Sequence, residues 1–289
     1  MEQPIITCCE AKRGVLWWTE AFYLVKEEWG AWFVIGAGYF AFIFSLAALF
    51  SLLVNMFPKA EMLLHLPTIL MPCLIVGFIA AGWSQVRGQK PRFNHFFSGF
   101  KSDVKTLLSI GLIMMILFML TGMIGESILG GSYEDMIRDI GEDTDAFLTR
   151  LFSPRFLSMT SVVTVLYTLI FFAVWLAPML VVFQRAKTVG AILGSLKAFL
   201  INWRAVTVYM LFLFFLTIVI FIAVALLMLF IALIIGPDLN LAKTGFELVS
   251  TLVVILLLPL FTSWAMLTSF VAYCDIFHAN DHIFPRLKK

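Results

Sequence analysis

Six long apolar runs without any Asp, Glu, Lys or Arg constrain the fold of this 289-residue chain more than any other feature. Each run is near or above the ~20 residues that a helix needs to cross ~30 Å of hydrocarbon. The runs are continuously apolar, whereas the strands of a membrane barrel alternate apolar and polar residues. The sequence therefore predicts an all-α polytopic membrane protein, a single domain over residues 1–289 with six transmembrane helices at 31–57, 62–83, 106–125, 159–183, 206–235 and 248–274.

The basic residues between these runs predict how the chain is oriented. Of its 20 Lys and Arg residues, 15 fall in the N-terminus, the second and fourth connections and the C-terminus, and five fall in the other three connections. Because loops rich in Lys and Arg stay on the cytoplasmic side, both termini are expected to be cytoplasmic. The net charge of +2 is too small to indicate a nucleic acid partner.

Three stretches with similar spacing precede the odd-numbered runs. Residues 22–29, 97–104 and 196–203 each place apolar residues three apart, followed by a polar residue and another apolar one. This spacing predicts amphipathic helices that lie along the inner membrane surface before the chain turns into the bilayer. The polar residues at the turn can accept hydrogen bonds from free N–H groups, so they are predicted helix caps: Glu28, Asp103 and Asn202.

Prolines in the even-numbered runs supply a second repeated feature. Pro72, Pro178 and Pro259 each lie inside a predicted span, where proline removes a backbone hydrogen bond and kinks the helix. The two features occur in the same order three times, although proline is common in transmembrane helices. We therefore expect three pseudo-repeated units of an interfacial helix and a helix pair, at about 15–90, 91–188 and 189–280, in a bundle with pseudo-threefold order.

The last of these interfacial stretches also carries a family resemblance. Residues 195–203, read as Ser-Leu-Lys-Ala-Phe-Leu-Ile-Asn-Trp, feed one span of a predicted six-helix bundle. The chain in this respect resembles proteobacterial inner-membrane families known only as domains of unknown function. It is more distantly similar to the membrane domain of some glycerophosphodiester phosphodiesterases. The resemblance implies a bacterial inner-membrane location and paired helices, and it transfers no catalytic or binding residue.

The predicted membrane interior contains no acidic or basic side chain. Ion-coupled transporters, proton pumps and intramembrane proteases place such groups at bilayer depth, so the sequence disfavours these classes. Small residues such as Gly36 and Gly77 are expected to allow close helix packing. The same residues would also fit a pathway for a neutral or lipid-like solute.

The connection at 126–158 is the largest predicted outer element. It contains six acidic residues between positions 134 and 145, with apolar residues at roughly helical intervals. We expect an acidic amphipathic helix, either solvated or facing a basic partner.

One group of residues has the chemistry of a metal site. Cys274, His278 and His282 are spaced four apart, so on a continuing helix they would share one face. Thiolate and imidazole ligands suit zinc or copper, and Cys8 and Cys9 could add sulfur. Ordinary interfacial packing is the alternative interpretation of these side chains.

No catalytic motif accompanies these features. The sequence contains no recognisable pair of nucleophile and base and no glycine-rich phosphate loop, so we expect neither an enzyme nor a cofactor. The leading hypothesis is a non-enzymatic inner-membrane protein that is either an accessory or scaffold subunit or a lipid-interacting protein, with membrane lipids or another inner-membrane protein or complex as its partners. The alternatives are a transporter or channel for a neutral or amphiphilic small molecule, and metal handling at the cytoplasmic face.

Overall fold

The computed structural model describes residues 6–57, 65–131, 149, 152–235 and 239–277, and this part of the chain is helical without strands. Apolar residues without interrupting charges favour helices here because a helix satisfies its own backbone hydrogen bonds. In chain order the helices are α1 (Arg13–Glu27), α2 (Trp29–Met56), α3 (Leu66–Val86), the 3-10 helix η2 (Phe93–Lys101), α4 (Val104–Leu129), α7 (Pro154–Trp175), α8 (Ala177–Gln184), α9 (Thr188–Ile201), α10 (Trp203–Ile235) and α11 (Leu239–Ile276).

Six apolar stretches of helix in the described residues are long enough to cross a membrane, which confirms the prediction of a multi-pass membrane protein. Most of these helices extend beyond the predicted apolar runs, because a helix ends at a turn residue and not at the point where the hydropathy of the sequence falls. The stretches are Trp29–Met56, Leu66–Val86, Val104–Leu129, Pro154–Gln184, Trp203–Leu227 and Ile255–Ile276.

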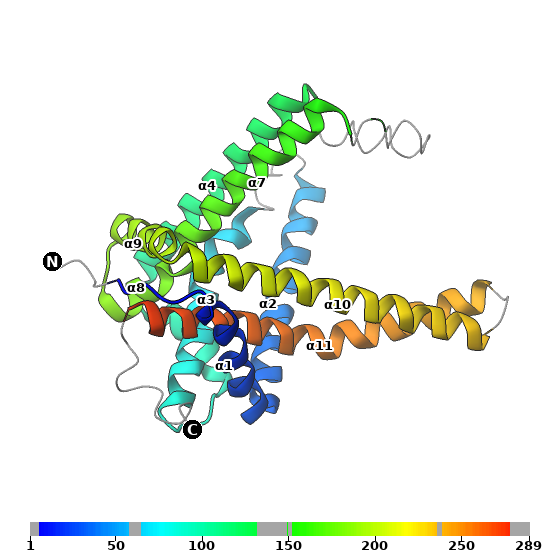
Figure 1. Cartoon of the computed structure of the whole chain (residues 1–289), viewed down its shortest axis with the longest axis horizontal. Coiled ribbons are helices and arrows are strands. Elements are labelled where there is room, and N and C mark those ends of the chain that lie inside the picture. The colour runs from blue at the N-terminus through cyan, green and yellow to red at the C-terminus, as the bar shows by residue number, and fades with distance from the viewer. Residues whose placement is uncertain (1–5, 58–64, 132–148, 150–151, 236–238, 278–289) are drawn as a thin grey trace.

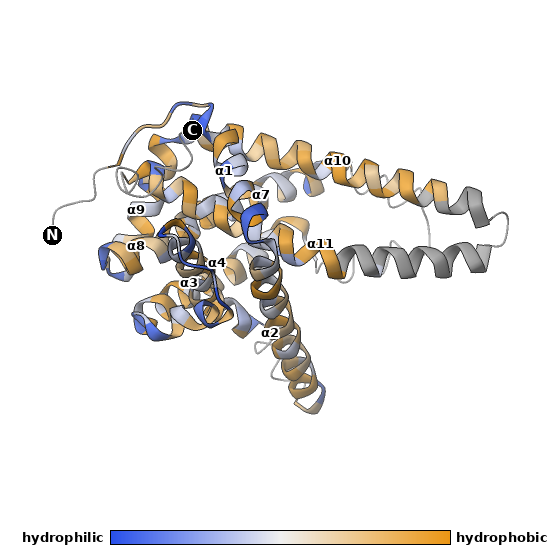
Figure 2. Ribbon diagram, turned by 90° about the horizontal axis from the view of Figure 1, so that it is seen from below, coloured by the Kyte–Doolittle hydropathy of each residue, from blue (hydrophilic) through white to orange (hydrophobic). Residues whose placement is uncertain are grey.

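The spanning helices diverge from a common packed region rather than forming one closed bundle (Figure 1). We call this region the hub; it contains α1, α3, η2, α8, α9, the N-terminal parts of α2 and α10 and the C-terminal half of α11. Three arms extend from it in different directions: α2, the α4/α7 pair and the α10/α11 pair (Figures 1 and 2). The part of the α10/α11 pair that is coloured in Figure 2 is mostly apolar.

Aromatic side chains fill the hub. Trp17, Trp18 and Trp32 are completely buried, as are Phe78 and Phe270. Trp18 stacks on Tyr209 of α10 with ring centroids 5.2 Å apart, and it meets Trp264 of α11 edge to face at 5.1 Å. These offset and edge-to-face arrangements are the favoured geometries for aromatic pairs. The aromatic packing therefore joins α1 to the last two helices of the chain.

Glycines allow helix backbones to touch at two hub contacts. The Cα of Gly36 in α2 lies against the backbone of Pro259 in α11, and any Cβ at position 36 would overlap the Pro259 carbonyl. Gly77 of α3 lies in the same way against the backbone of Phe96 in η2. The prediction that small residues mediate close helix packing is confirmed at both positions.

Each short helix before an odd-numbered span packs on a neighbouring hairpin. The first, α1, packs on α10 and α11; η2 packs on α3; and α9 packs on α7 and α8. The predicted segment at 97–104 begins in a 3-10 helix, not in an α-helix. These contacts hold the short helices against the spanning helices within the hub.

The predicted outer loop at 126–158 is shorter than expected at both ends. Helix α4 continues to Leu129, where Gly130 has a left-handed conformation with φ 78° that ends the helix. Helix α7 begins at Pro154, and the Ser153 side chain caps it by accepting a hydrogen bond from the Phe156 N–H at 3.2 Å. The acidic stretch between positions 134 and 145 lies outside the described residues.

Candidate functional site

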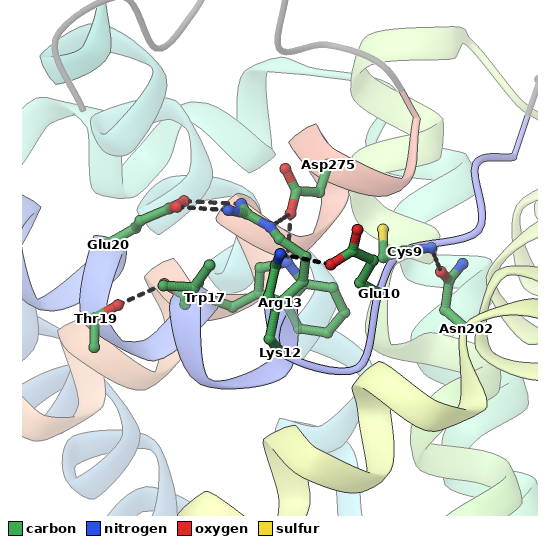
Figure 3. A network of polar contacts seen from close by, with 10 residues as sticks. Cys9, Glu10, Lys12, Arg13, Trp17, Thr19, Glu20, Asn202 and Asp275 are labelled. Carbon is green, nitrogen blue, oxygen red and sulfur yellow. Dashed lines mark hydrogen bonds and ion pairs between the residues drawn. The ribbon is translucent and has the colours of Figure 1, made fainter. Parts of the chain in front are cut away.

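The N-terminal segment crosses the junction of α9, α10 and α11, where it takes part in a network of polar contacts (Figure 3). We call residues 6–12 the N-terminal strap. Its Thr7 N–H donates to the Ile276 carbonyl at 2.8 Å, close to the end of α11. Its Cys9 N–H donates to Asn202 Oδ1 at 2.7 Å, and Asn202 Nδ2 donates to the Thr7 carbonyl at 3.0 Å. The strap therefore connects the start of the chain to its last three helices.

Directly after the strap, Arg13 lies between two carboxylates (Figure 3). Its Nη1 and Nη2 donate to Glu20 at 2.9 and 3.2 Å, and its Nε donates to Asp275. Trp17 Nε1 donates to the same Asp275 oxygen at 2.8 Å. We call Arg13, Trp17, Glu20 and Asp275 the ionic cluster. Arg13 and Glu20 face one another because they lie seven residues apart, two turns along α1.

Partial burial makes this cluster more important than a surface ion pair. The side chains of Arg13, Glu20 and Asp275 are only 25%, 20% and 10% exposed. Trp17 packs against Trp175 and Tyr209 at centroid distances of 6.2 and 6.1 Å, so aromatic rings lie next to the charges. Breaking a shielded ion pair leaves a charge with neither a partner nor full hydration, which is strongly destabilising.

The ionic cluster combines one cation with two carboxylates, and burial and hydrogen bonding shift the pKa values of Glu20 and Arg13. Burial raises the pKa of Glu20, and the negative charge of Asp275 adds to the rise, while Arg13 opposes it. Burial alone would lower the pKa of Arg13, but its hydrogen bonds to Asp275 and Glu20 outweigh that effect and raise it. Arg13 is thus held in its charged form, whereas Glu20 binds a proton more readily than an exposed glutamate.

The predicted metal ligands have contrasting surroundings. Cys274 is completely buried within α11, while His278 and His282 lie outside the described residues. Burial, and next the charge of Asp275, raises the pKa of Cys9 to about 12, so this thiol stays protonated near neutral pH. Cys8 is exposed. In the part of the chain that the structure describes, no three His, Cys, Asp or Glu side chains form a group suited to a metal ion.

All three predicted turn residues lie between consecutive helices, but they act differently. Asp103 caps α4: its carboxylate accepts from the Thr106 N–H at 3.3 Å and from the Thr106 hydroxyl at 2.7 Å. Glu28 makes no capping hydrogen bond, so the predicted cap is wrong there; it lies 3.8 Å from Lys90 Nζ instead. The Asn202 side chain binds the N-terminal strap, a long-range role that local spacing does not reveal.

The three predicted kink prolines are all buried in the hub, but only one coincides with a helix break. Pro72 and Pro259 lie inside the continuous helices α3 and α11. Pro178 lies in the first turn of α8, directly after α7 ends at Trp175. Because all three prolines are buried among packed helices, their positions suit helix packing better than the lining of a solute pathway.

A serine from α9 satisfies the backbone at this break. The Ser195 hydroxyl accepts from the Leu176 N–H at 3.0 Å and donates to the Phe172 carbonyl at 2.6 Å. In an unbroken helix these two backbone groups would bond to each other, so the hydroxyl bridges the opened bond. Ser195 is completely buried. Ser195 belongs to the motif at 195–203, but local spacing does not predict that it bridges a helix break.

A second buried amide also escaped prediction. Gln85, near the end of α3, accepts from Trp32 Nε1 at 2.8 Å and donates to the Leu24 carbonyl at 2.8 Å. It thereby joins α1, α2 and α3. The sequence signal is a glutamine two residues after the apolar run 62–83, because a buried polar side chain at the end of a span needs hydrogen-bond partners from neighbouring helices.

Comparison of the chain with family models, with curated proteins and with solved structures returned no match.

Proposed function

We propose that this protein is a non-enzymatic membrane scaffold whose arms associate laterally with lipids or with another membrane protein. The surface of α10 carries the proposal. In the most apolar 18-residue window of Trp203–Leu227, no side chain is buried by the rest of the chain. Phe214, Val219 and Phe221 are 58%, 61% and 74% exposed. A continuous apolar surface of this kind needs lipid or an apolar partner around it.

The hub supports a scaffold because it holds the arms in fixed positions. The N-terminal strap and the ionic cluster join the first helix to the last one. Within the described residues of this junction, the chemistry favours binding over catalysis: the Cys9 thiol stays protonated, and Arg13 engages both Glu20 and Asp275. A nucleophile would need the opposite, a lowered pKa or an adjacent base.

The proposal includes the orientation and setting that the sequence predicts. Both termini would face the cytoplasm of a bacterial inner membrane, since the Lys and Arg excess lies in the connections on that side. The three pseudo-repeated units belong to the same proposal. Their support is that α1, η2 and α9 each pack on a neighbouring hairpin.

Photocrosslinking in intact membranes tests the lateral association. The photoreactive residue p-benzoylphenylalanine would replace Phe221, and a matched variant would carry it at Trp18, which is completely buried in the hub. We expect position 221 to crosslink to phospholipid or to one defined membrane protein and position 18 to crosslink only within the chain. Equal product patterns from both positions would overturn the proposal, because α10 would then be covered by its own chain.

A further inference from the structure

A hollow of about 640 Å³ lies beside the C-terminal end of α3, and its lining includes no residue of α10 or of the ionic cluster. The chain turns there at Gly88, whose φ of 81° is left-handed, and then enters η2. Hydrogen bonds stabilise the turn: the Gln89 N–H donates to the Ser84 carbonyl at 3.1 Å. The hollow is lined by Ser84, Gln89, Lys90, Pro91, Arg92 and His95.

The side chains around this hollow offer hydrogen-bond donors. Lys90 and Arg92 supply charged N–H groups, and Gln89 supplies an amide N–H, while the Ser84 hydroxyl donates to Gln89 Oε1 at 3.4 Å. The Arg92 backbone N–H donates to His95 Nδ1 at 3.0 Å, so the proton of the neutral imidazole is on Nε2. No carboxylate is among the residues that line the hollow. Outside the lining, Glu28 forms an ion pair with Lys90 Nζ at 3.8 Å and would compete with a bound anion.

The local charge and position also favour an anion. Between Ser84 and Lys105 the sequence has five Lys and Arg residues and one acidic residue, Asp103. This segment connects the candidate spans α3 and α4, so it lies where lipid headgroups meet water. Basic side chains at that level attract anionic headgroups, and a guanidinium matches the geometry of a phosphate.

Aromatic residues next to the hollow suit a lipid in particular. Phe93 and Phe97 follow Arg92 in η2, and each is 41% exposed. The Phe93 ring packs against Gly38 of α2, and it meets Phe97 edge to face with centroids 5.8 Å apart. An apolar surface beside a basic hollow can hold an acyl chain next to its own phosphate.

We propose that this hollow is a binding site for a phosphate group, and that the phosphate belongs to an anionic glycerophospholipid. Lys90 and Arg92 bind the phosphate oxygens, His95 Nε2 and the Gln89 side-chain amide N–H add uncharged donors, and Phe93 and Phe97 contact the acyl chain. A soluble phosphate compound has the same phosphate group but no acyl chain that could contact Phe93 and Phe97. The site lies on α3 and η2, so it does not depend on the proposed association of α10.

The test uses the purified full-length chain and two probes, phosphatidylglycerol and inorganic phosphate. Lipid retention would be measured by native mass spectrometry after reconstitution in phosphatidylcholine with and without phosphatidylglycerol. Phosphate binding would be measured by calorimetry in detergent. In the double variant Lys90→Gln, Arg92→Gln we expect phosphatidylglycerol affinity to fall by roughly tenfold or more, since two charge-assisted hydrogen-bonding groups are lost.

The matched control is the double variant Lys101→Gln, Lys105→Gln, which removes the same charge from the same connection without touching the hollow. We expect it to retain nearly all of the affinity. Equal losses in the two double variants would overturn the site, because diffuse attraction would then explain the binding. Absence of binding by both probes would also overturn it. Tight binding of inorganic phosphate with no preference for phosphatidylglycerol would keep the phosphate site and refute the lipid assignment.

Folding of each variant is checked by its helical circular dichroism and its elution volume. The Lys90 side chain is 80% exposed, so the single variant Lys90→Gln should fold even if the double variant does not. Its loss of phosphatidylglycerol affinity should be smaller than that of the double variant and provides a second test of the site. Crosslinking from position 221 on α10 should be unchanged in all of these variants. The phosphate site and the lateral association can therefore fail separately.

Discussion

Replacing Asn202 with alanine should release the N-terminal strap. The Asn202 side chain is only 1% exposed and holds two groups of the strap, the Cys9 N–H at 2.7 Å and the Thr7 carbonyl at 3.0 Å. Its third partner, the Ala198 carbonyl, keeps the backbone hydrogen bond from the residue 202 N–H at 3.0 Å. The substitution therefore leaves two backbone groups, the Cys9 N–H and the Thr7 carbonyl, without a hydrogen-bond partner, rather than three.

The expected magnitude follows from these two groups. An unsatisfied buried group costs about 1–3 kcal/mol, and both strap groups are only partly buried, so we take about 1–2 kcal/mol for each. The total of about 2–4 kcal/mol corresponds to a roughly 30- to 1,000-fold increase in the equilibrium population of the open strap. The hydrogen bond from the Thr7 N–H to the Ile276 carbonyl remains and limits the opening.

Hydrogen–deuterium exchange of the peptide that contains residues 6–12 measures this opening, because amide exchange reports the free energy of local unfolding. We expect faster exchange of the Cys9 amide in Asn202→Ala than in the wild type. Asn94→Ala is the matched control, since Asn94 is an exposed asparagine of η2. Exchange as slow in Asn202→Ala as in Asn94→Ala would refute the assignment of Asn202 as the residue that holds the strap.

Three further predictions concern single side chains of the hub and of the N-terminal strap. Ser195→Ala should lower the free energy of unfolding in detergent by about 1–3 kcal/mol, because it leaves the Leu176 N–H and the Phe172 carbonyl without a hydrogen-bond partner. Unchanged stability would contradict the bridging role of Ser195. Thr7→Val should instead preserve or increase thermal stability, because the Thr7 hydroxyl is buried without a hydrogen-bond partner; a clear loss would show that the hydroxyl is used. Glu20, whose pKa is raised in the folded state, binds a proton there more readily than in the unfolded chain. Stability should therefore rise as the pH falls from the raised pKa towards 4.5, and Glu20→Gln should abolish this part of the pH dependence; an equal pH dependence in the variant would exclude Glu20 as its source.

The spanning helices could be predicted from sequence because their signal is local. A charge-free apolar run is sufficient to predict a membrane helix, and all six runs coincide with apolar helices. The ends were less predictable. Helix α4 continues through the polar residue Glu126 as far as Leu129, because Gly130 rather than hydropathy ends it.

The polar contacts of the hub depend on residues far apart in the chain, and periodicity does not report them. Arg13 and Asp275 are separated by 262 positions, so no local pattern connects them. Asp103 caps the helix that it precedes, and its role could be predicted because capping is local. Asn202 has the same place in the repeated pattern as Asp103, yet its side chain binds the N-terminal strap from elsewhere in the sequence.

The helix break before Pro178 shows the same limit. A proline within an apolar run predicts a lost hydrogen bond, and this holds equally for Pro72 and Pro259. Only at Pro178 does the helix end and begin again, and there the Ser195 hydroxyl from another helix bridges the opened backbone. The partner that stabilises the break becomes visible only once α9 is placed against α7.

The accessibility of α10 in a bilayer tests the central claim most directly. Cysteines introduced one at a time at Phe214, Val219 and Phe221 would carry spin labels in a Cys8→Ser, Cys9→Ser background, with the purified chain reconstituted in lipid vesicles. The two remaining cysteines, Cys73 and Cys274, are completely buried, and the background without an introduced cysteine controls for their labelling. The scaffold account predicts high collision rates with oxygen and low rates with a water-soluble nickel complex at all three positions, because lipid surrounds this helix. Low oxygen accessibility along α10, matching that of a label at the buried Trp18, would contradict the account, since the chain itself would then cover the surface proposed for lateral association.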